Sequence, residues 1–335
     1  MRAWQLAGTY SIDGLALSEG PDPVPGPGQV AVAVKAVSLN FRDLLVVKGL
    51  YSRKLALPLT ICSDGAGEVS AVGEGVTRFK PGDRVAGIFM QSWIAGQPDE
   101  AKARSAMGAF YPGILAEKVV LHEDGLVSIP PHLSWAEAAT LPCTGVTAWN
   151  ALVRMGGIKA GDTVLTLGSG GVSLFALQLA RAAGARVIAT TSSDAKGARL
   201  RELGASDVIN YNATPDWEEA VRKLTGGGVD FVVEIGGAAT INKSIRAARI
   251  GGFVALIGNR AEGQADVNLT AALMKSIRIQ GVFVGSREMF EELNRALTLH
   301  QIHPVIDSTF PFEQAQDALR RLQSGAHFGK VVIEV

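Results

Sequence analysis

Residues 163–184 read TVLTLGSGGVSLFALQLARAAG, in which a short apolar run leads through a glycine-rich turn into a longer one. The first run has the length of a buried strand and the second that of a helix. Gly168 permits a tight turn, Gly170 lets a ligand approach the backbone, and Ser173 stands where a third glycine is usual. The helix N-terminus adds free N–H groups and a positive dipole end. The stretch predicts a pyrophosphate site made by Gly168, Ser169, Gly170, Gly171 and Val172.

The second half of the chain alternates strand and helix signals. Short apolar runs lie at 163–167, 186–191, 208–210, 229–235, 252–257 and 277–282. Helical patterns separate most of them, and two of these helices end on Gly184 and Gly204 as C-caps. Such alternation implies right-handed crossovers, so the sequence predicts an α/β fold with a doubly wound parallel sheet of the Rossmann type.

The first third of the chain reads as β structure. Residues 29–34 alternate with period two, and glycine and proline punctuate the strands that follow. Residues 91–113 lack strict periodicity and predict a long loop. The terminal strand GKVVIEV needs a sheet to join, so we expect the first domain to be discontinuous. The predicted division is a β-rich substrate domain at 1–126 and 284–335, and a cofactor domain at 127–283.

Composition excludes several classes of protein. The 335 residues carry 32 basic and 32 acidic side chains, so nothing favours a nucleic-acid or membrane-surface partner. Two cysteines, Cys62 and Cys143, are too few for a disulfide framework or a zinc knuckle. The first residues contain no apolar secretory segment. These features predict a cytoplasmic protein of two domains.

The end of the second predicted strand indicates which dinucleotide binds. Thr191 lies 23 residues after Gly168, where a site for NAD would place Asp or Glu against the ribose 2′-hydroxyl. Ser192 and Lys196 follow at once and offer a hydroxyl donor and a cation for a 2′-phosphate. Asp194 is discordant, and we interpret it as the N-cap of the next helix. The pattern favours NADPH over NADH.

Several motifs together resemble one family over essentially the whole chain. They are VGEGVTRFKPGDRV at 72–85, LPCTGVTAWNAL at 141–152, the glycine turn, GASDVINY at 204–211 and HFGKVVIEV at 327–335. The chain resembles the medium-chain dehydrogenase/reductase superfamily, and within it the zinc-free quinone-reductase and enoyl-reductase branch. That resemblance implies a GroES-like substrate domain, a Rossmann cofactor domain and an active site in the cleft between them.

The resemblance also implies further cofactor contacts. Tyr211 would lie beside the 2′-phosphate together with Lys196. Thr147, just beyond Cys143, would contact the nicotinamide. The residues expected to flank the nicotinamide are Ile257, Gly258, Asn259, Phe283 and Val284.

Departures from the zinc enzymes of this superfamily predict that no catalytic metal is bound. Asn40 stands in place of a ligand cysteine, and Ser63 in Cys62-Ser63-Asp64 stands in place of the ligand histidine. Only Cys143 keeps a ligand type at its position, whereas a catalytic zinc normally has three protein ligands. The lobe that carries a four-cysteine zinc site in those enzymes is free of cysteine here. The five histidines share no metal-like spacing.

Without a Lewis acid, hydrogen-bond donors must stabilise the charge that hydride transfer creates on a carbonyl oxygen. Asn40 is the first candidate because its amide is a donor, and Tyr51 is the candidate proton donor. Arg42 and Asp43 are read as an ion pair or as capping residues rather than catalysts. Trp93 either walls the substrate pocket or anchors its loop.

The sequence therefore predicts an NADPH-dependent, zinc-independent reductase of quinones or α,β-unsaturated carbonyls, including enoyl thioesters. An NAD(P)-dependent alcohol dehydrogenase and a non-catalytic, crystallin-like NADPH-binding protein are the alternatives. We expect a small-molecule substrate and a homodimer formed through an edge strand near 252–257 or 277–282.

Overall fold

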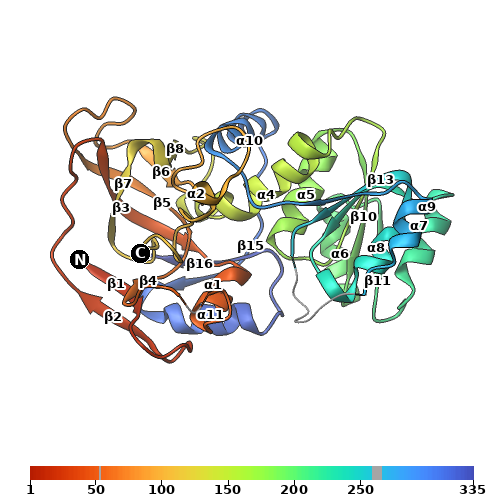
Figure 1. The fold of residues 1–335 in the computed structure, drawn as a ribbon, viewed down its shortest axis with the longest axis horizontal. Coiled ribbons are helices and arrows are strands. Elements are labelled where there is room, and N and C mark those ends of the chain that lie inside the picture. Colours follow the sequence, from red (N-terminus) through yellow and green to blue (C-terminus); the bar gives the residue numbers. More distant parts are fainter. Residues whose placement is uncertain (53, 259–265) are drawn as a thin grey trace. The chain divides into compact units, whose positions relative to one another are not determined.

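The computed structural model describes residues 1–52, 54–258 and 266–335, and they form two compact units (Figure 1). One unit comprises residues 1–146 and 285–335, and the other comprises residues 147–284. The cofactor unit thus begins at residue 147 rather than at 127 as expected. The reason is local packing, because helix α3 (Trp135–Ala139) contacts strands β3 (Gln29–Ser38) and β5 (Asp64–Val72) of the first unit.

The described part of the cofactor unit contains one sheet of six parallel strands in the order β11-β10-β9-β12-β13-β14. They are β9 (Thr163–Thr166), β10 (Arg186–Thr191), β11 (Asp207–Asn210), β12 (Val229–Glu234), β13 (Ala248–Leu256) and β14 (Arg278–Gly281). This order reverses between β9 and β12, as in doubly wound folds. The predicted α/β fold class is confirmed.

The described helices of this unit alternate with its strands, as the sequence predicted. They are α5 (Gly171–Ala182), α6 (Asp194–Glu202), α7 (Trp217–Thr225), α8 (Ile241–Ala247) and α9 (Leu269–Met274). Gly184 and Gly204 have φ of +79° and +95° just past α5 and α6, as a helix C-cap requires. The N-cap prediction for Asp194 was wrong. Ser193 caps α6, and its hydroxyl accepts from the Lys196 N–H.

The larger sheet of the first unit, as far as the chain is described, runs β15-β16-β3-β5-β6-β8, with β7 also paired to β3. The bounds are β6 (Arg84–Gly87), β7 (Lys118–His122), β8 (Leu126–Ser128), β15 (Ile306–Pro311) and β16 (Lys330–Glu334). Strand β16 pairs antiparallel with β3, so the chain end returns to the first unit as predicted (Figure 1).

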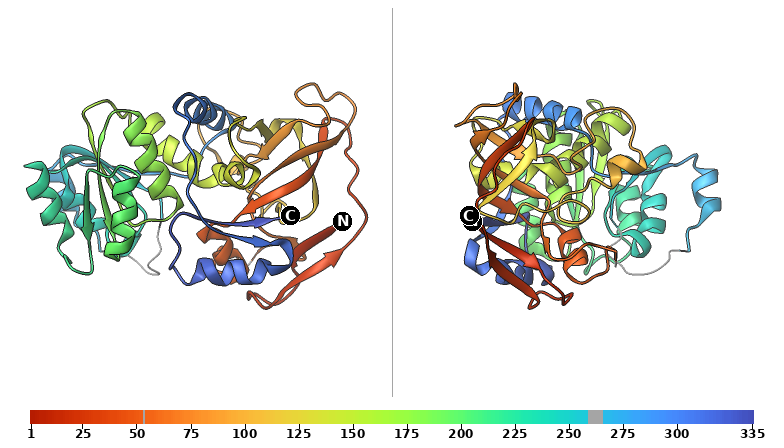
Figure 2. Two further views of the ribbon diagram at one scale, coloured as in Figure 1. Left: turned by 180° about the vertical axis from the view of Figure 1, so that it is seen from behind. Right: turned by 60° about the vertical axis from the view of Figure 1, so that its left-hand side comes forward.

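A smaller sheet, β2-β1-β4, closes the same unit and comprises β1 (Arg2–Leu6), β2 (Leu15–Glu19) and β4 (Leu59–Thr60). Helix α11 (Ala315–Gln323) lies beside these first strands, as Figure 2 shows. The Trp4 indole N–H donates to the Phe312 carbonyl at 2.8 Å, and Gln316 donates to the Leu15 carbonyl at 3.0 Å. Contacts far apart in sequence therefore hold both chain ends in one core.

Residues 91–113 form the predicted loop, which contains only the short helix α2 (Glu100–Ala103). Trp93 is fully buried, and its indole N–H donates to the Gly96 carbonyl at 2.9 Å. Its own carbonyl accepts from the N–H of Arg287, the first residue of helix α10 (Arg287–His300). These bonds support the interpretation of Trp93 as a loop anchor. Among the residues described, no helix combines the length and apolarity needed to span a membrane.

Candidate active site

The glycine turn has the geometry that a dinucleotide pyrophosphate needs. Gly168 follows β9 with φ of +72°, and Gly170 is the N-cap of α5. Apart from the adjoining backbone, no atom of the described residues lies within 4 Å of the position where a Cβ on Gly170 would stand, so these residues leave space beside the turn. The hydroxyl of Ser173 donates to the Leu167 carbonyl at 2.6 Å. The hydroxyl of the residue in place of the third glycine therefore donates within the turn and does not cap the N–H groups at the start of α5.

A cavity of about 350 Å³ lies at the carboxyl ends of the parallel strands in this unit. Its lining residues are Leu167, Gly168, Thr190, Tyr211, Pro215, Trp217, Ile235, Gly236, Ala239, Thr240 and Lys243. Ligands of doubly wound folds bind at this edge, where the strand order reverses. The mixed aromatic, apolar and hydroxyl lining suits an adenosine group.

The structure brings the predicted 2′-phosphate residues to one edge of the sheet. Strands β10 and β11 end in register, with Thr191 opposite Asn210, and the Tyr211 N–H donates to the Thr191 carbonyl at 2.9 Å. Ser192 follows Thr191, and Lys196 lies in the first turn of α6. The Thr191 hydroxyl is buried without a hydrogen-bond partner in the described chain.

Sequence reasoning missed Glu234, the last residue of β12, whose carboxylate is fully buried. One of its oxygens accepts from the Gly236 N–H at 2.6 Å, the Gly237 N–H at 2.9 Å and the Thr240 hydroxyl at 2.6 Å. The other accepts from the Ser244 hydroxyl. The carboxylate therefore fixes the cavity wall between β12 and α8. Its signal in the sequence is an acidic residue that directly follows the apolar run Phe231–Val233 at the end of a strand.

The residues expected around the nicotinamide lie at the same sheet edge. Ile257 follows β13, and Phe283 and Val284 follow β14, its parallel neighbour. The Ile257 N–H donates to the Glu234 carbonyl at 2.9 Å. Thr147 is buried in the short helix α4 (Val146–Trp149). Asn259 lies outside the described residues.

In the first unit, Asn40 belongs to a buried polar cluster. It follows β3 and is the N-cap of α1 (Phe41–Val47), and its side chain is only 5% exposed. The ammonium group of Lys330 donates to the Asn40 side-chain oxygen and, at 2.6 Å, to the Leu39 carbonyl. Because Lys330 can only donate, it fixes which way the Asn40 amide points. The amide nitrogen is left buried, without a hydrogen bond of ordinary geometry in the described structure.

Asp64 is the acidic member of this cluster. Its oxygens accept from the Ser63 hydroxyl at 2.7 Å and from the Cys143 N–H at 3.0 Å. Burial raises the pKa of Asp64 to about 6, against the opposing effect of the Lys330 charge. Burial likewise lowers the pKa of Lys330, which is 3% exposed, while the Asp64 charge opposes that shift. Asp64 and Lys330 thus offset each other's charge inside the protein.

Sequence reasoning also missed Lys330, although it is the second residue of the motif GKVVIEV. Its signal is a basic residue in a strand whose next three residues are all buried. Its partners Asn40 and Asp64 are distant in the sequence. They meet it because β3 pairs with both β16 and β5.

Tyr51 lies against a cation. The guanidinium carbon of Arg42 is 4.8 Å from the centre of the Tyr51 ring and 5.1 Å from that of Phe89. Arg42 also donates to Asp43 at 3.3 Å, while an Asp43 oxygen accepts from the Asn40 N–H at 2.8 Å. Arg42 and Asp43 therefore form the ion pair, and Asp43 caps α1, as the two interpretations from sequence proposed.

The residues at the metal-ligand positions do not fit a catalytic zinc. Asn40 already accepts a hydrogen bond from an ammonium group, and Ser63 donates its hydroxyl to Asp64. Burial raises the pKa of the Cys143 thiol well above its usual value, which favours the neutral form over a thiolate ligand. In the residues that can be described, no group of three His, Cys, Asp or Glu side chains could hold a metal ion.

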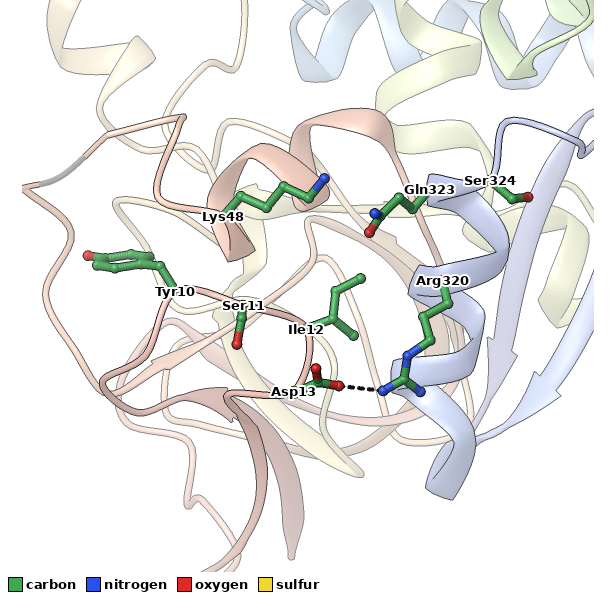
Figure 3. A pocket seen from close by; sticks show the side chains of 8 residues that line it. All are labelled: Tyr10, Ser11, Ile12, Asp13, Lys48, Arg320, Gln323 and Ser324. Carbon is green, nitrogen blue, oxygen red and sulfur yellow. Dashed lines mark hydrogen bonds and ion pairs between the residues drawn. The ribbon is translucent and has the colours of Figure 1, made fainter.

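A separate cavity of about 570 Å³ contains none of the predicted site residues (Figure 3). It is lined by Tyr10, Ser11, Ile12, Asp13, Lys48, Arg320, Gln323 and Ser324. Arg320 is ion-paired with Asp13 across it, so its charge is already neutralised. The candidate functional residues are therefore those of the cofactor cavity in one unit and those of the Asn40 cluster in the other.

Known proteins share both halves of this arrangement. Residues 26–131 match the alcohol dehydrogenase GroES-like domain, and residues 171–298 match the zinc-binding dehydrogenase family. The chain belongs to the medium-chain dehydrogenase/reductase superfamily, whose members are oxidoreductases that use a nicotinamide dinucleotide.

Particular relatives differ in what their names state. A zinc-type alcohol dehydrogenase-like protein of Schizosaccharomyces pombe is 43% identical, covering 92% of this chain and 91% of its own length. An acryloyl-coenzyme A reductase of Metallosphaera sedula is 30% identical, covering 96% of each. A solved structure described as an NAD-dependent alcohol dehydrogenase is 36% identical, covers all of both chains and has a TM-score of 0.92.

Proposed function

We propose that this protein reduces the carbon–carbon double bond of α,β-unsaturated carbonyl compounds, or the equivalent system of a quinone, with NADPH and without zinc. The observation that carries the proposal is the Asn40 amide, whose oxygen is held by Lys330 and whose nitrogen is a buried donor beside Asp64 without a hydrogen bond of ordinary geometry in the described structure. A donor fixed in this way is suited to an oxygen that gains negative charge during the reaction.

The bound dinucleotide would supply the hydride, which adds to the β-carbon of the substrate. The chain's own residues then have two tasks. Asn40 donates to the carbonyl oxygen as it becomes an enolate, in a site where burial strengthens the hydrogen bond. Tyr51 donates the proton that completes the reduction, and the adjacent Arg42 guanidinium stabilises the phenolate that remains.

The preference for NADPH rests on the end of β10. Thr191 carries no charge that would repel a 2′-phosphate. Ser192 and Tyr211 follow the ends of β10 and β11, and Lys196 lies in the first turn of α6. Changing Thr191→Asp should lower kcat/KM for NADPH at least tenfold relative to NADH, because a carboxylate repels the phosphate and binds a free ribose hydroxyl. Steady-state kinetics with both dinucleotides measures this. Unchanged selectivity would contradict the assignment.

An assay of metal-free protein tests the reaction itself. After dialysis against a chelator, the protein should oxidise NADPH with enones, enoyl thioesters or quinones, and added zinc should not raise the rate. A dehydrogenase for alcohols would instead turn over an alcohol with NAD or NADP and lose activity on chelation. A non-catalytic binding protein would bind NADPH and turn over neither class.

We further propose that two copies associate through strand β14. In the described sheet, β14 is an edge strand that pairs only with β13, and all four of its residues are exposed. Exposed apolar side chains lie on this strand and on the elements next to it in the sheet or in the chain, namely Ile279 on β14, Ile250 on β13, and Leu269, Leu273 and Met274 on α9. An exposed apolar edge is a template for strand pairing, and a second copy related by a two-fold axis presents the matching edge.

A further inference from the structure

Val284, which follows β14, has a backbone conformation that its side chain disfavours. Its φ is +49°, in the left-handed region. Four non-glycine residues have positive φ in the described chain, and Val284 is the β-branched one among them. A branched Cβ crowds the backbone in this region, so the surroundings must hold the residue there. Such strain tends to persist where a function requires it.

The residue that holds Val284 is Asn150. Its side-chain amide nitrogen donates to the Val284 carbonyl at 2.7 Å, across 134 residues of sequence. Asn150 is fully buried, and its side-chain oxygen has no hydrogen-bond partner among the described residues. It begins the π-helical turn Asn150–Met155, a conformation frequent at functional sites.

A purely structural role does not explain this side chain. Burying an amide with one polar atom unsatisfied is unfavourable, so an apolar residue would suit a core position in this helix better. The role of Asn150 therefore depends on its described side-chain hydrogen bond, whose acceptor is the carbonyl of the strained residue. The positive φ of Val284 and the unsatisfied oxygen of Asn150 are both unfavourable, and one hydrogen bond links the two residues. Two unfavourable features in one contact are typical of a functional constraint.

We infer that Asn150 is a positioning residue, which holds Val284 in the left-handed conformation that the nicotinamide half of the cofactor site needs. This inference rests on the proposed function. Residues 283–284 leave β14 at the edge of the sheet where ligands bind in doubly wound folds. Without the Asn150 bond, Val284 relaxes toward an extended conformation and redirects that segment.

The strand order makes the expected effect selective. Val284 follows β14 at one edge of the sheet, whereas the predicted 2′-phosphate residues follow β10 and β11 toward the other. Loss of the bond therefore disturbs the nicotinamide half of the site and leaves the adenosine half unchanged. A general loss of folding would weaken both.

The test compares two ligands by calorimetry, NADPH and adenosine 2′,5′-bisphosphate, which lacks the nicotinamide. Asn150→Ala should weaken NADPH binding about tenfold and change binding of the bisphosphate by less than twofold. Adding Val284→Gly to this variant should restore most of the NADPH affinity, because glycine reaches positive φ without a side-chain clash. Asn294→Ala is the matched control and should affect neither ligand. It removes the same type of bond, from a buried Asn to the Ser128 carbonyl at 2.9 Å, in the other unit.

Equal weakening of both ligands, no weakening, or failure of Val284→Gly to rescue would each overturn the inference. If Asn150→Ala does not fold, the double variant decides: it should fold and bind NADPH within threefold of Val284→Gly alone, and a double variant that also fails to fold contradicts the account. If the unaltered protein does not bind NADPH, the proposed function fails instead.

Discussion

At the scale of single residues, the site depends on charges that the fold removes from water together. Lys330 and Asp64 are both buried, and each offsets the desolvation of the other. Such a pair contributes little net stability, since removing two charges from water costs about as much as their attraction returns. What it contributes is orientation, because the ammonium group fixes the Asn40 amide.

The raised pKa of Asp64 predicts a pH dependence of stability with a definite sign. The native carboxyl has a pKa of about 6, above its ordinary value of 3.8, so between pH 4 and 6 the native state holds more protons than the unfolded state. Stability from this group is present below pH 4 and is lost as pH rises through 6. The free energy of unfolding of the unaltered protein, relative to Asp64→Asn, should therefore fall by on the order of 3 kcal/mol across this window. Denaturant titrations at several pH values measure it, and a difference that rises with pH would refute the assignment.

Short sequence motifs were enough to nominate Asn40 and Tyr51 as candidate catalytic residues. They also predicted the glycine turn and suggested the capping role of Asp43. The departure from a zinc-ligand pattern is local as well, because Asn40 and Ser63 each stand in a short motif where a ligand residue would be expected. Lys330 escaped notice because its role exists only where β16 returns beside β3. Asn150 escaped notice for the same reason, since its partner Val284 lies 134 residues away.

At the scale of elements, the loop after β12 shows how one side chain shapes a cavity wall. Glu234 gathers two backbone N–H groups and two hydroxyls from the segment that leads into α8. The sequence predicted the strands and helices on either side, because apolar periodicity reports burial. It did not predict the conformation of the connection, because that depends on hydrogen bonds to a buried carboxylate.

Replacing Glu234→Gln should loosen this wall. The new amide nitrogen cannot accept from the donors that surround it, so we expect a loss of about 1–3 kcal/mol in stability and weaker dinucleotide binding. Thermal unfolding and calorimetry measure the two effects. Asp230→Asn is the control, because Asp230 accepts from Thr163 and Arg249 elsewhere on the same strand. Dinucleotide affinity lost equally in both variants would assign Glu234 a general structural role.

At the scale of the whole molecule, the strand order places the proposed cofactor site and the proposed dimer contact on different parts of one sheet. The carboxyl ends of the parallel strands carry the cofactor cavity, and β14, which pairs with β13, is hydrogen-bonded on one side only in the described sheet. The discontinuous organisation was predicted from the terminal strand alone. The boundary at residue 147 was not, because helices α3 and α4 are nearly contiguous and only the packing of α3 on β3 and β5 distinguishes them.

The proposed association through β14 predicts a change of oligomeric state. Light scattering should give twice the chain mass for the unaltered protein and the single chain mass for Ile279→Lys with Leu273→Glu. A charge on the edge strand opposes pairing, and the second charge removes an exposed apolar side chain of α9. Leu299→Glu is the control, since Leu299 is equally apolar and exposed but lies on α10. A monomeric unaltered protein, or a dimer that survives the double change, would argue against this interface.

The most direct test of the central claim is the turnover number of Asn40→Asp with NADPH and an α,β-unsaturated ketone. The aspartate keeps the shape, the helix cap and an acceptor for Lys330, and it replaces the amide donor with a carboxylate that cannot donate when ionised and whose charge opposes that of an enolate. If Asn40 stabilises the developing enolate, kcat should fall by about 10² to 10³ while the affinity for NADPH stays the same. A kcat within threefold of the unaltered protein would show that the charge on the substrate oxygen is stabilised by another group.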